Sequence, residues 1–227
     1  MKKIVKIENL EEFVERFGQR YSEILGIDLS ARKDEEIFKW FLASLLFGAP
    51  ITESSVIKTY KCFEKKGVLT PKRILKTEWK GLVEILDDGS YTRYDFKTAD
   101  KLLEVMESLI EKYGGSLNQI HGEASDARDL ENRLKDLGKG IGDVTVSIFL
   151  REMRDLWEKA DPPPISLEML AAKESGLIEE GATGQEALKQ LKAFWAKHKV
   201  AGKSFVNFGT ALVRLGKELR KKRKTCH

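Results

Sequence analysis

The sequence predicts an all-α fold, and three observations support that class. Apolar residues recur at helical spacing along nearly the whole chain. Capping residues, prolines and glycines fall where those periodic segments begin and end. The one alternating stretch, residues 3–7, is too short to indicate a strand. With 227 residues, 41% of them hydrophobic, the chain is long enough for one or two domains with a proper core.

Six helical segments are predicted in the first half of the chain. Asn9 begins the first with an N-cap pattern, and Asp34 is expected to cap the second. Gly48-Ala49-Pro50 ends the second segment, Thr52 opens the third, and Gly67 closes it. The segments span residues 9–24, 34–47, 52–66, 71–77, 78–86 and 95–113.

The second half is predicted to contain a helical hairpin and three further helices. A short helical turn at residues 116–121 precedes a charged helix over 126–137. That helix runs into a glycine-rich turn, which an apolar helix over 144–157 follows at once. Pro162-Pro163-Pro164 then breaks the chain. The remaining helices are expected over residues 165–176, 185–198 and 204–222.

The glycine-rich turn is the most informative stretch of the sequence. Gly138, Gly140 and Gly142 allow backbone conformations with φ > 0 and a close approach to another surface. The amides from Gly142 to Thr145 lie at a helix N-terminus, where unpaired N–H groups and the helix dipole favour an anion. A nucleic-acid phosphate fits this description, and it would be held without reading the base sequence. The alternative is a tight helix–helix connection that uses its glycines for packing alone.

Charge and hydropathy indicate which partners the chain can take. No segment approaches the roughly 18 apolar residues of a membrane span, so no membrane partner is expected. The basic N-terminus has no apolar signal core, and we expect a cytoplasmic protein. The net charge is +4, and a basic C-terminal run is able either to attract phosphates or to form a solvated helix end. This run comprises Arg214, Lys217, Arg220, Lys221, Lys222, Arg223 and Lys224.

The order of these segments resembles the helix-hairpin-helix base-excision DNA glycosylase superfamily, which includes endonuclease III. Residues 37–61 are similar to that family's early helix pair, and residues 93–115 to its long helix before the hairpin. Residues 140–146 are similar to the hairpin itself. The resemblance implies a two-lobed fold, with one lobe at 34–146 and the other at 1–33 plus 147–227. It also implies a monomer that binds double-stranded DNA and holds an extruded nucleotide between the lobes.

The resemblance assigns the catalytic role to Asp161, nineteen residues after Gly142. Cleavage of an N-glycosidic bond builds positive charge on the sugar, which a nearby carboxylate stabilises. The same carboxylate is able to orient or deprotonate the attacking water. The alternative for Asp161 is an ordinary turn or capping aspartate ahead of a proline. The expected reaction is hydrolytic removal of a damaged or mispaired base.

Two departures from the family limit this expectation. Val144 occupies the position at which bifunctional members carry a lysine nucleophile, so we expect a monofunctional enzyme. Cys62 and Cys226 are far apart and do not form the family's four-cysteine loop, so no iron–sulfur cluster or other metal cofactor is expected. A monovalent cation at the hairpin carbonyls is implied by the family alone. The competing functions are a non-catalytic helix-hairpin-helix DNA-binding protein and a helical scaffold that binds other proteins.

The remaining candidates surround a possible base pocket or wedge. Ile51 lies in the early turn where an apolar wedge is possible, although a buried or turn residue is the more common role. Tyr91 and Tyr94 fall in a turn and are expected to be exposed. The predicted DNA-binding residues are Gly138, Lys139, Gly140, Ile141, Gly142, Val144, Thr145, Arg93 and Lys97.

Overall fold

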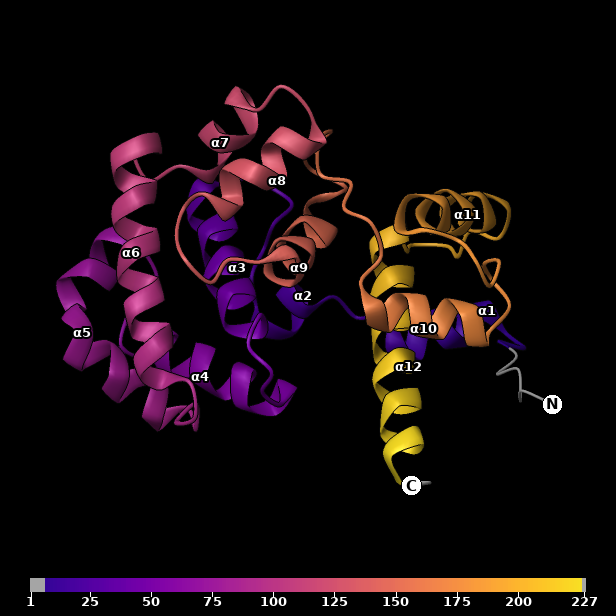
Figure 1. Ribbon diagram of the computed structural model, residues 1–227, viewed down its shortest axis with the longest axis horizontal. Helices are drawn as coiled ribbons and strands as arrows, with labels where there is room; N and C mark the ends of the chain where they lie inside the picture. Colours follow the sequence, from indigo (N-terminus) through magenta and orange to yellow (C-terminus); the bar gives the residue numbers. More distant parts are fainter. Residues whose placement is uncertain (1–6, 226–227) are drawn as a thin grey trace. The chain divides into compact units, whose positions relative to one another are not determined.

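The computed structural model describes residues 7–225, and within them every regular element is an α-helix (Figure 1). The predicted all-α class is confirmed. The helices divide between two compact units, one made of Met1–Ile24 and Pro162–His227 and the other of Leu25–Asp161. We call them the terminal unit and the central unit and describe each by itself. No helix in the described part of the chain is long and apolar enough to cross a membrane.

The central unit is built around a helix that is buried on nearly all sides. In α3, Trp40 and Phe41 are almost completely buried, and both contact α9. The indole nitrogen of Trp40 donates to the Phe149 carbonyl at 3.1 Å, and the Phe41 and Phe149 rings pack edge to face. The helices of this unit are α3 (Asp34–Phe47), α4 (Glu53–Lys65), α5 (Pro71–Asp88), α6 (Asp95–Tyr113), α7 (Leu117–Glu123), α8 (Ala127–Lys135) and α9 (Asp143–Met153).

Local capping chemistry sets several of these boundaries. The Thr52 hydroxyl accepts from the Ser55 amide, and the Asp126 carboxylate accepts from the Asp129 amide, so both act as N-caps. Asp34 does not cap α3 as predicted, because it is the first helical residue and Lys33 holds the cap position. The Asp34 carboxylate instead accepts from the Ser116 hydroxyl, which ties α3 to the start of α7.

Helix α5 contains the break that the sequence predicts between two short helices. Glu78 has φ 58° and ψ 171°, a conformation that is almost restricted to glycine, and the helical path kinks there. The long helix α6 follows the predicted bounds Asp95–Tyr113 and ends at Gly114 in the left-handed conformation. Helices α5 and α6 pack along each other, as Figure 1 shows.

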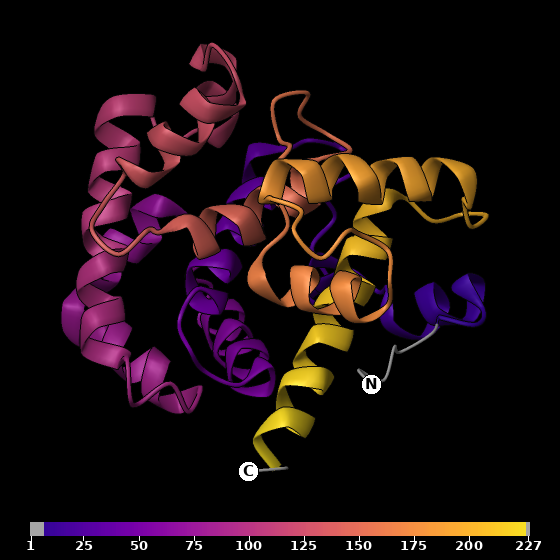
Figure 2. The same ribbon diagram turned by 45° about the vertical axis from the view of Figure 1, so that its right-hand side comes forward.

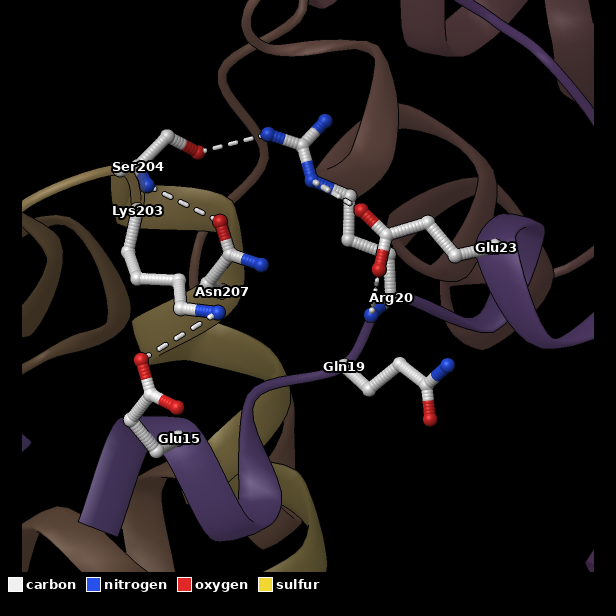
Figure 3. Close-up of a pocket in the computed structure, with 8 residues that line it drawn as sticks. Glu15, Gln19, Arg20, Glu23, Lys203, Ser204 and Asn207 are labelled. Atoms are coloured by element: carbon white, nitrogen blue, oxygen red, sulfur yellow. Dashed lines mark hydrogen bonds and ion pairs between the residues drawn. The ribbon is translucent and has the colours of Figure 1, made fainter. Parts of the chain in front are cut away.

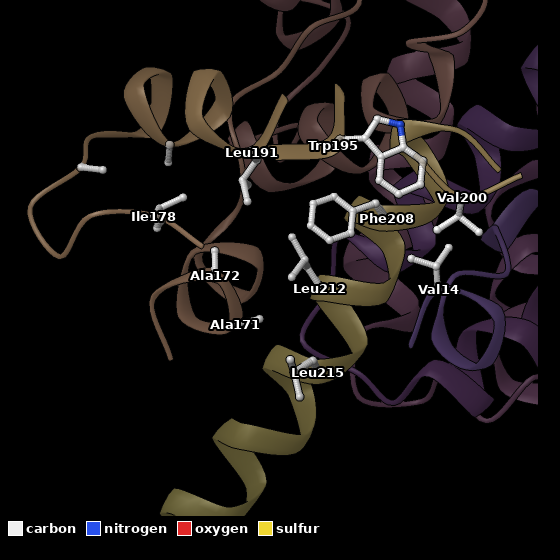
Figure 4. Packing of buried hydrophobic residues seen from close by; sticks show 12 residues of the cluster. Val14, Ala171, Ala172, Ile178, Leu191, Trp195, Val200, Phe208, Leu212 and Leu215 are labelled. Carbon is white, nitrogen blue, oxygen red and sulfur yellow. The ribbon is translucent and has the colours of Figure 1, made fainter. Parts of the chain in front are cut away.

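The terminal unit packs three helices around the long C-terminal one (Figure 2). It contains α1 (Leu10–Phe17), α10 (Ser166–Glu174), α11 (Gly184–Lys197) and α12 (Phe205–Thr225). Its core includes Val14, Trp195, Phe208 and Leu212, whose side chains converge in Figure 4. The Trp195 and Phe208 rings stack with centroids 5.4 Å apart. This apolar contact joins α11 to α12 and fixes the unit's architecture.

The first predicted helix is interrupted in the structure. Helix α1 ends at Phe17, and the short helix α2 (Tyr21–Leu25) begins after an intervening turn. Only glycine fits at the break, because a Cβ at Gly18 would lie 3.0 Å from the backbone oxygen of Asn207 and closer still to that of Val14. The Asn207 side-chain amide donates to the Gly18 carbonyl at 3.0 Å. Close approach of α12 therefore sets the end of α1.

The structure also corrects the predicted chain ends and lobe boundaries. Arg214 and Lys217 lie over the ring of Tyr21, and Lys217 donates to its hydroxyl, so part of the basic C-terminal run packs within the unit. Residues 25–33 and 147–161 belong to the central unit, because α9 packs on α3. Cys226 and the basic residues before position 7 lie outside the described part of the chain.

Candidate nucleic-acid interface

The predicted hairpin forms between α8 and α9 in the central unit. The charged helix α8 is amphipathic and buries Leu130 and Leu134, so its apolar face packs inward. The connecting turn is closed by a hydrogen bond from the Ile141 amide to the Gly138 carbonyl at 3.4 Å. Ile141 is nearly buried, which anchors the turn to the core. The turn is therefore a defined structure between two packed helices.

Helix α6 supports this turn and explains two of its glycines. A Cβ at Gly138 would lie 2.8 Å from the Val105 side chain, so only glycine permits the observed approach. Gly140 has φ 86°, which glycine adopts without steric cost. The Glu104 carboxylate accepts from the Lys139 amide at 3.0 Å and so fixes the backbone of the turn. The packing and the anion-binding interpretations of the glycines are therefore compatible.

Lys101 contacts the hairpin turn, although it is not among the site residues that the sequence predicts. Its aliphatic stem lies beneath Gly140, since a Cβ there would be 3.4 Å from Lys101 Cδ. Its ammonium group donates to the Leu45 carbonyl in the last turn of α3 at 3.0 Å. Burial lowers the pKa of Lys101 to about 8. No sequence signal indicates this environment, because a lysine at an amphipathic helical position is normally solvated.

The N-terminus of α9 presents an open set of backbone donors. The amides of Gly142, Asp143, Val144 and Thr145 donate to no acceptor among residues 7–225. A Cβ added at Gly142 would meet no atom within 4 Å, so the space in front of the turn is open. Val144 is 54% exposed, and Lys139 is exposed as well. This arrangement suits an anion that approaches along the helix axis.

The side chains of the predicted DNA-binding set do not all reach the surface. Thr145 is buried, and its hydroxyl packs against Gly48 at the end of α3. With Ile141 also buried, these two residues offer only backbone groups to a ligand. The Asp143 carboxylate is almost fully exposed, and Lys135 contacts it at 2.6 Å. That ion pair offsets the negative charge that a carboxylate would otherwise place beside a phosphate.

Arg93, Tyr94 and Lys97 lie together at the start of α6. They line a hollow of about 400 Å³ with Asp95 and Phe96. The Arg93 guanidinium lies over the Tyr94 ring at 5.5 Å. The structure thus brings these three predicted residues together on one surface, whereas the hairpin turn is supported farther along the same helix.

The prediction that Tyr91 is exposed is wrong. Its side chain is completely buried, and its hydroxyl donates to the Leu46 carbonyl at 2.6 Å. Burial raises the pKa of Tyr91 above its usual range. The hydroxyl hydrogen-bonds a carbonyl at the C-terminal end of α3, so the role of Tyr91 is structural. Ile51 is partly buried in the bend between α3 and α4, and its amide donates to the Ala49 carbonyl.

Asp161 lies at the C-terminal end of the central unit and is held by an arginine. The Arg154 Nε lies 3.2 Å from Asp161 Oδ1, and the arginine side chain is 8% exposed. The carboxylate itself is 36% exposed. This ion pair orients the carboxylate and partly offsets its negative charge. Among residues 7–225, no group of three or more His, Cys, Asp or Glu side chains is arranged to hold a metal ion.

A second hollow lies in the terminal unit and is lined almost entirely by polar side chains. Figure 3 shows Arg20 and Lys203 facing the carboxylates of Glu23 and Glu15 across it. Ser204 accepts from Arg20, and the Ser204 amide donates to Asn207, so the start of α12 is capped by its own side chains. Two cations and two carboxylates balance in charge, which gives this hollow no preference for an anion.

Comparison with known protein families finds no matching family, and none of the curated proteins or solved structures compared with the chain matches it.

Proposed function

We propose that the chain binds the backbone of duplex DNA through the α8–α9 hairpin. The observation that carries this proposal is the open row of amides from Gly142 to Thr145 at the start of α9. A phosphate oxygen accepts such N–H groups without reference to base identity, and the helix dipole adds to the attraction. The exposed Lys139 adds a positive charge beside the amides, and Val144 adds an apolar contact.

The charge at the hairpin predicts moderate, salt-dependent affinity. Asp143 is neutralised by Lys135, so Lys139 is the main uncompensated charge in the turn. Each phosphate neutralised by a cation adds roughly 0.9 to the slope of log affinity against log salt. A shallow but measurable slope is therefore expected, because few phosphates are contacted.

The test replaces the exposed apolar residue at the hairpin tip with an acid. Val144→Glu places a carboxylate where the phosphate would dock, while the side chain stays in solvent. We expect duplex affinity, measured by fluorescence anisotropy, to fall roughly tenfold or more, about 1.4 kcal/mol. Gln185→Glu makes the same charge change on an exposed position of the terminal unit and should alter affinity less than twofold. Equal binding by the parent and Val144→Glu would refute the proposal.

A second candidate function, base excision, rests on the position of Asp161. Its carboxylate is 36% exposed and oriented by Arg154, and it follows Gly142 by nineteen residues. In that role it would stabilise the positive charge that develops on the sugar as the glycosidic bond breaks, and it would position the water. Val144 provides no amine nucleophile, so the product would be an abasic site without strand cleavage by the hairpin.

A panel of duplexes, each with one lesion or mismatch, tests this second function. Asp161→Asn should abolish the formation of abasic sites and leave duplex affinity unchanged. Asp155→Asn, an exposed carboxylate nearby in sequence, should leave both properties intact. Full turnover by Asp161→Asn would remove Asp161 from the mechanism. Intact duplex binding without turnover on any substrate would leave DNA binding as the function.

A further inference from the structure

Two aromatic side chains of the central unit lie together in solvent. Trp79 in α5 is 39% exposed and Phe96 in α6 is 57% exposed. Their ring centroids are 5.2 Å apart, with the planes tilted by 43°. Together with Val144 they are the large hydrophobic side chains that stand out as exposed among the described residues. An aromatic pair left in water, when most other large rings of this unit are buried, indicates a contact surface.

The orientation of Trp79 is fixed by specific interactions. Its indole N–H donates to Asp100 Oδ1 in α6 at 2.8 Å. The residue before it, Glu78, adopts the positive φ that kinks α5 and turns the following helix against α6. Strained backbone of this kind persists where the surrounding structure holds it. The ring is therefore held ready for a ligand and loses little freedom when one binds.

Two exposed cations lie beside the aromatic pair, which also borders the carboxylates of Asp95 and Asp100. Phe96 shares its hollow with Arg93 and Lys97, and neither cation pairs with a carboxylate among residues 7–225. The one carboxylate of the hollow, Asp95, accepts from the Phe96 amide at 2.7 Å. The backbone amides of Asp95 and Lys97 donate to no described acceptor. Aromatic faces and unpaired cations thus adjoin each other.

We propose that Trp79, Phe96, Arg93 and Lys97 bind an unpaired segment of nucleic acid. Bases stack on the rings of Trp79 and Phe96, and the phosphates between them contact Arg93 and Lys97. This combination of stacking rings with cations is the chemistry by which proteins hold single strands without sequence preference. The surface uses α5 and the start of α6, so the inference does not depend on the proposed role of the hairpin.

The size of the patch favours this ligand over a protein partner. The two rings expose roughly 200 Å² between them, since a fully exposed aromatic side chain presents about 150–250 Å². A stable protein interface buries about 800 Å² on each partner. A nucleotide base needs only one ring face, which Phe96 or Trp79 supplies. Acidic peptides would contact the same two cations and serve as the competing outcome in the test.

Tryptophan fluorescence of the full chain provides a direct readout. Trp40, Trp157 and Trp195 are buried, so a ligand that stacks in this patch quenches chiefly Trp79. We expect quenching by a 15-residue oligothymidylate, and oligouridylate in a parallel titration shows whether DNA or RNA is preferred. Trp79→Phe should remove the quenching, whereas Trp195→Phe should keep it. Phe96→Ser, at an exposed position, should weaken single-strand binding roughly tenfold.

Three results would overturn the inference. The first is that oligonucleotides leave the fluorescence unchanged or bind the parent and Phe96→Ser with equal affinity, since either finding shows that the aromatic pair is not a stacking site. The second is quenching by polyglutamate but not by oligonucleotides, which would indicate a protein partner. The third is loss of duplex and single-strand binding together in Phe96→Ser. Val144→Glu separates this inference from the proposed hairpin function, because it should weaken duplex binding and leave oligothymidylate binding unchanged.

Discussion

The partly buried amine of Lys101 makes the stability of the chain depend on pH in a defined direction. Lys101 lies under the hairpin turn and donates to the Leu45 carbonyl. Burial lowers its pKa from 10.5 to about 8. At about 1.36 kcal/mol per pKa unit, keeping this amine protonated in the folded chain costs about 3 kcal/mol at neutral pH. Removing the charge should therefore change the pH profile of unfolding.

The sign follows from proton binding in the two states. The folded chain releases the Lys101 proton near pH 8, whereas the unfolded chain keeps it until about pH 10.5. The unfolded state binds more protons between these values, so the free energy of unfolding rises with pH. Between pH 7 and pH 9.5 the rise from this group is about 2 kcal/mol. The measurement stops at pH 9.5 because burial raises the pKa of Tyr60 and Tyr91. Above pH 10 these tyrosines ionise more readily in the unfolded chain, so the free energy of unfolding that they contribute falls.

Urea unfolding at pH 7 and pH 9.5 measures this effect. Lys101→Met and Lys101→Gln should both lose the rise of about 2 kcal/mol, whatever their stability at one pH. Two variants are needed because methionine leaves the Leu45 carbonyl without its donor, whereas glutamine keeps an N–H group. Lys76→Met removes an exposed lysine of α5 and should retain the parent slope. An unchanged slope in both Lys101 variants would refute the burial argument.

Four other substitutions have outcomes that the structure fixes. Gly138→Ala should destabilise the chain by about 1–3 kcal/mol, because its Cβ meets Val105, whereas Gly142→Ala, which faces open space, should be neutral in chemical unfolding; equal effects would contradict this packing. Tyr91→Phe should cost about 1–2 kcal/mol by removing a buried hydrogen bond, and an unchanged melting curve would argue against that bond. Glu78→Gly should raise stability by roughly 1 kcal/mol through relief of strain, and a loss would contradict it.

Helix positions are predictable from the sequence because local chemistry determines most of them. Helix α6 follows the predicted bounds since its apolar spacing and the left-handed Gly114 are local signals. The break in α5 is also predictable, although its cause, the strained Glu78, is not. The end of α1 is not predictable because it depends on Asn207, which is distant in sequence. The capping role expected of Asp34 fails for the same reason, since its real partner is Ser116, the residue that precedes α7.

The backbone conformation of the site can be predicted from the sequence, but the environments of its side chains cannot. The glycines locate the hairpin turn, because conformational freedom belongs to the residue itself. Whether Tyr91 is buried or Val144 exposed depends on packing against other helices, which a single sequence does not specify. For that reason the sequence does not predict the environments of Lys101, Trp79 and Phe96. All three lie at positions typical of ordinary helical residues.

Helix α6 connects the two proposed nucleic-acid contacts. Phe96 lies near its start, and Glu104, which holds the hairpin turn, lies eight residues later. At 1.5 Å per residue the two points are about 12 Å apart along the helix axis, roughly three to four nucleotides of one strand. Because α6 is one continuous helix of 19 residues, both contacts are held in a fixed relation. A ligand with duplex next to a single strand is therefore able to meet both contacts at once.

This geometry predicts cooperation between the two surfaces on a junction substrate. A duplex with a thymidine tail of about ten residues should bind at least tenfold more tightly than the blunt duplex or the free tail, because the second contact forms within the complex. Val144→Glu and Phe96→Ser should each remove most of this gain, and the double variant, which lacks both contacts, should bind the tailed duplex more weakly than either single variant. Affinity for the tailed duplex equal to that for the blunt duplex would show that the two surfaces do not engage one ligand together.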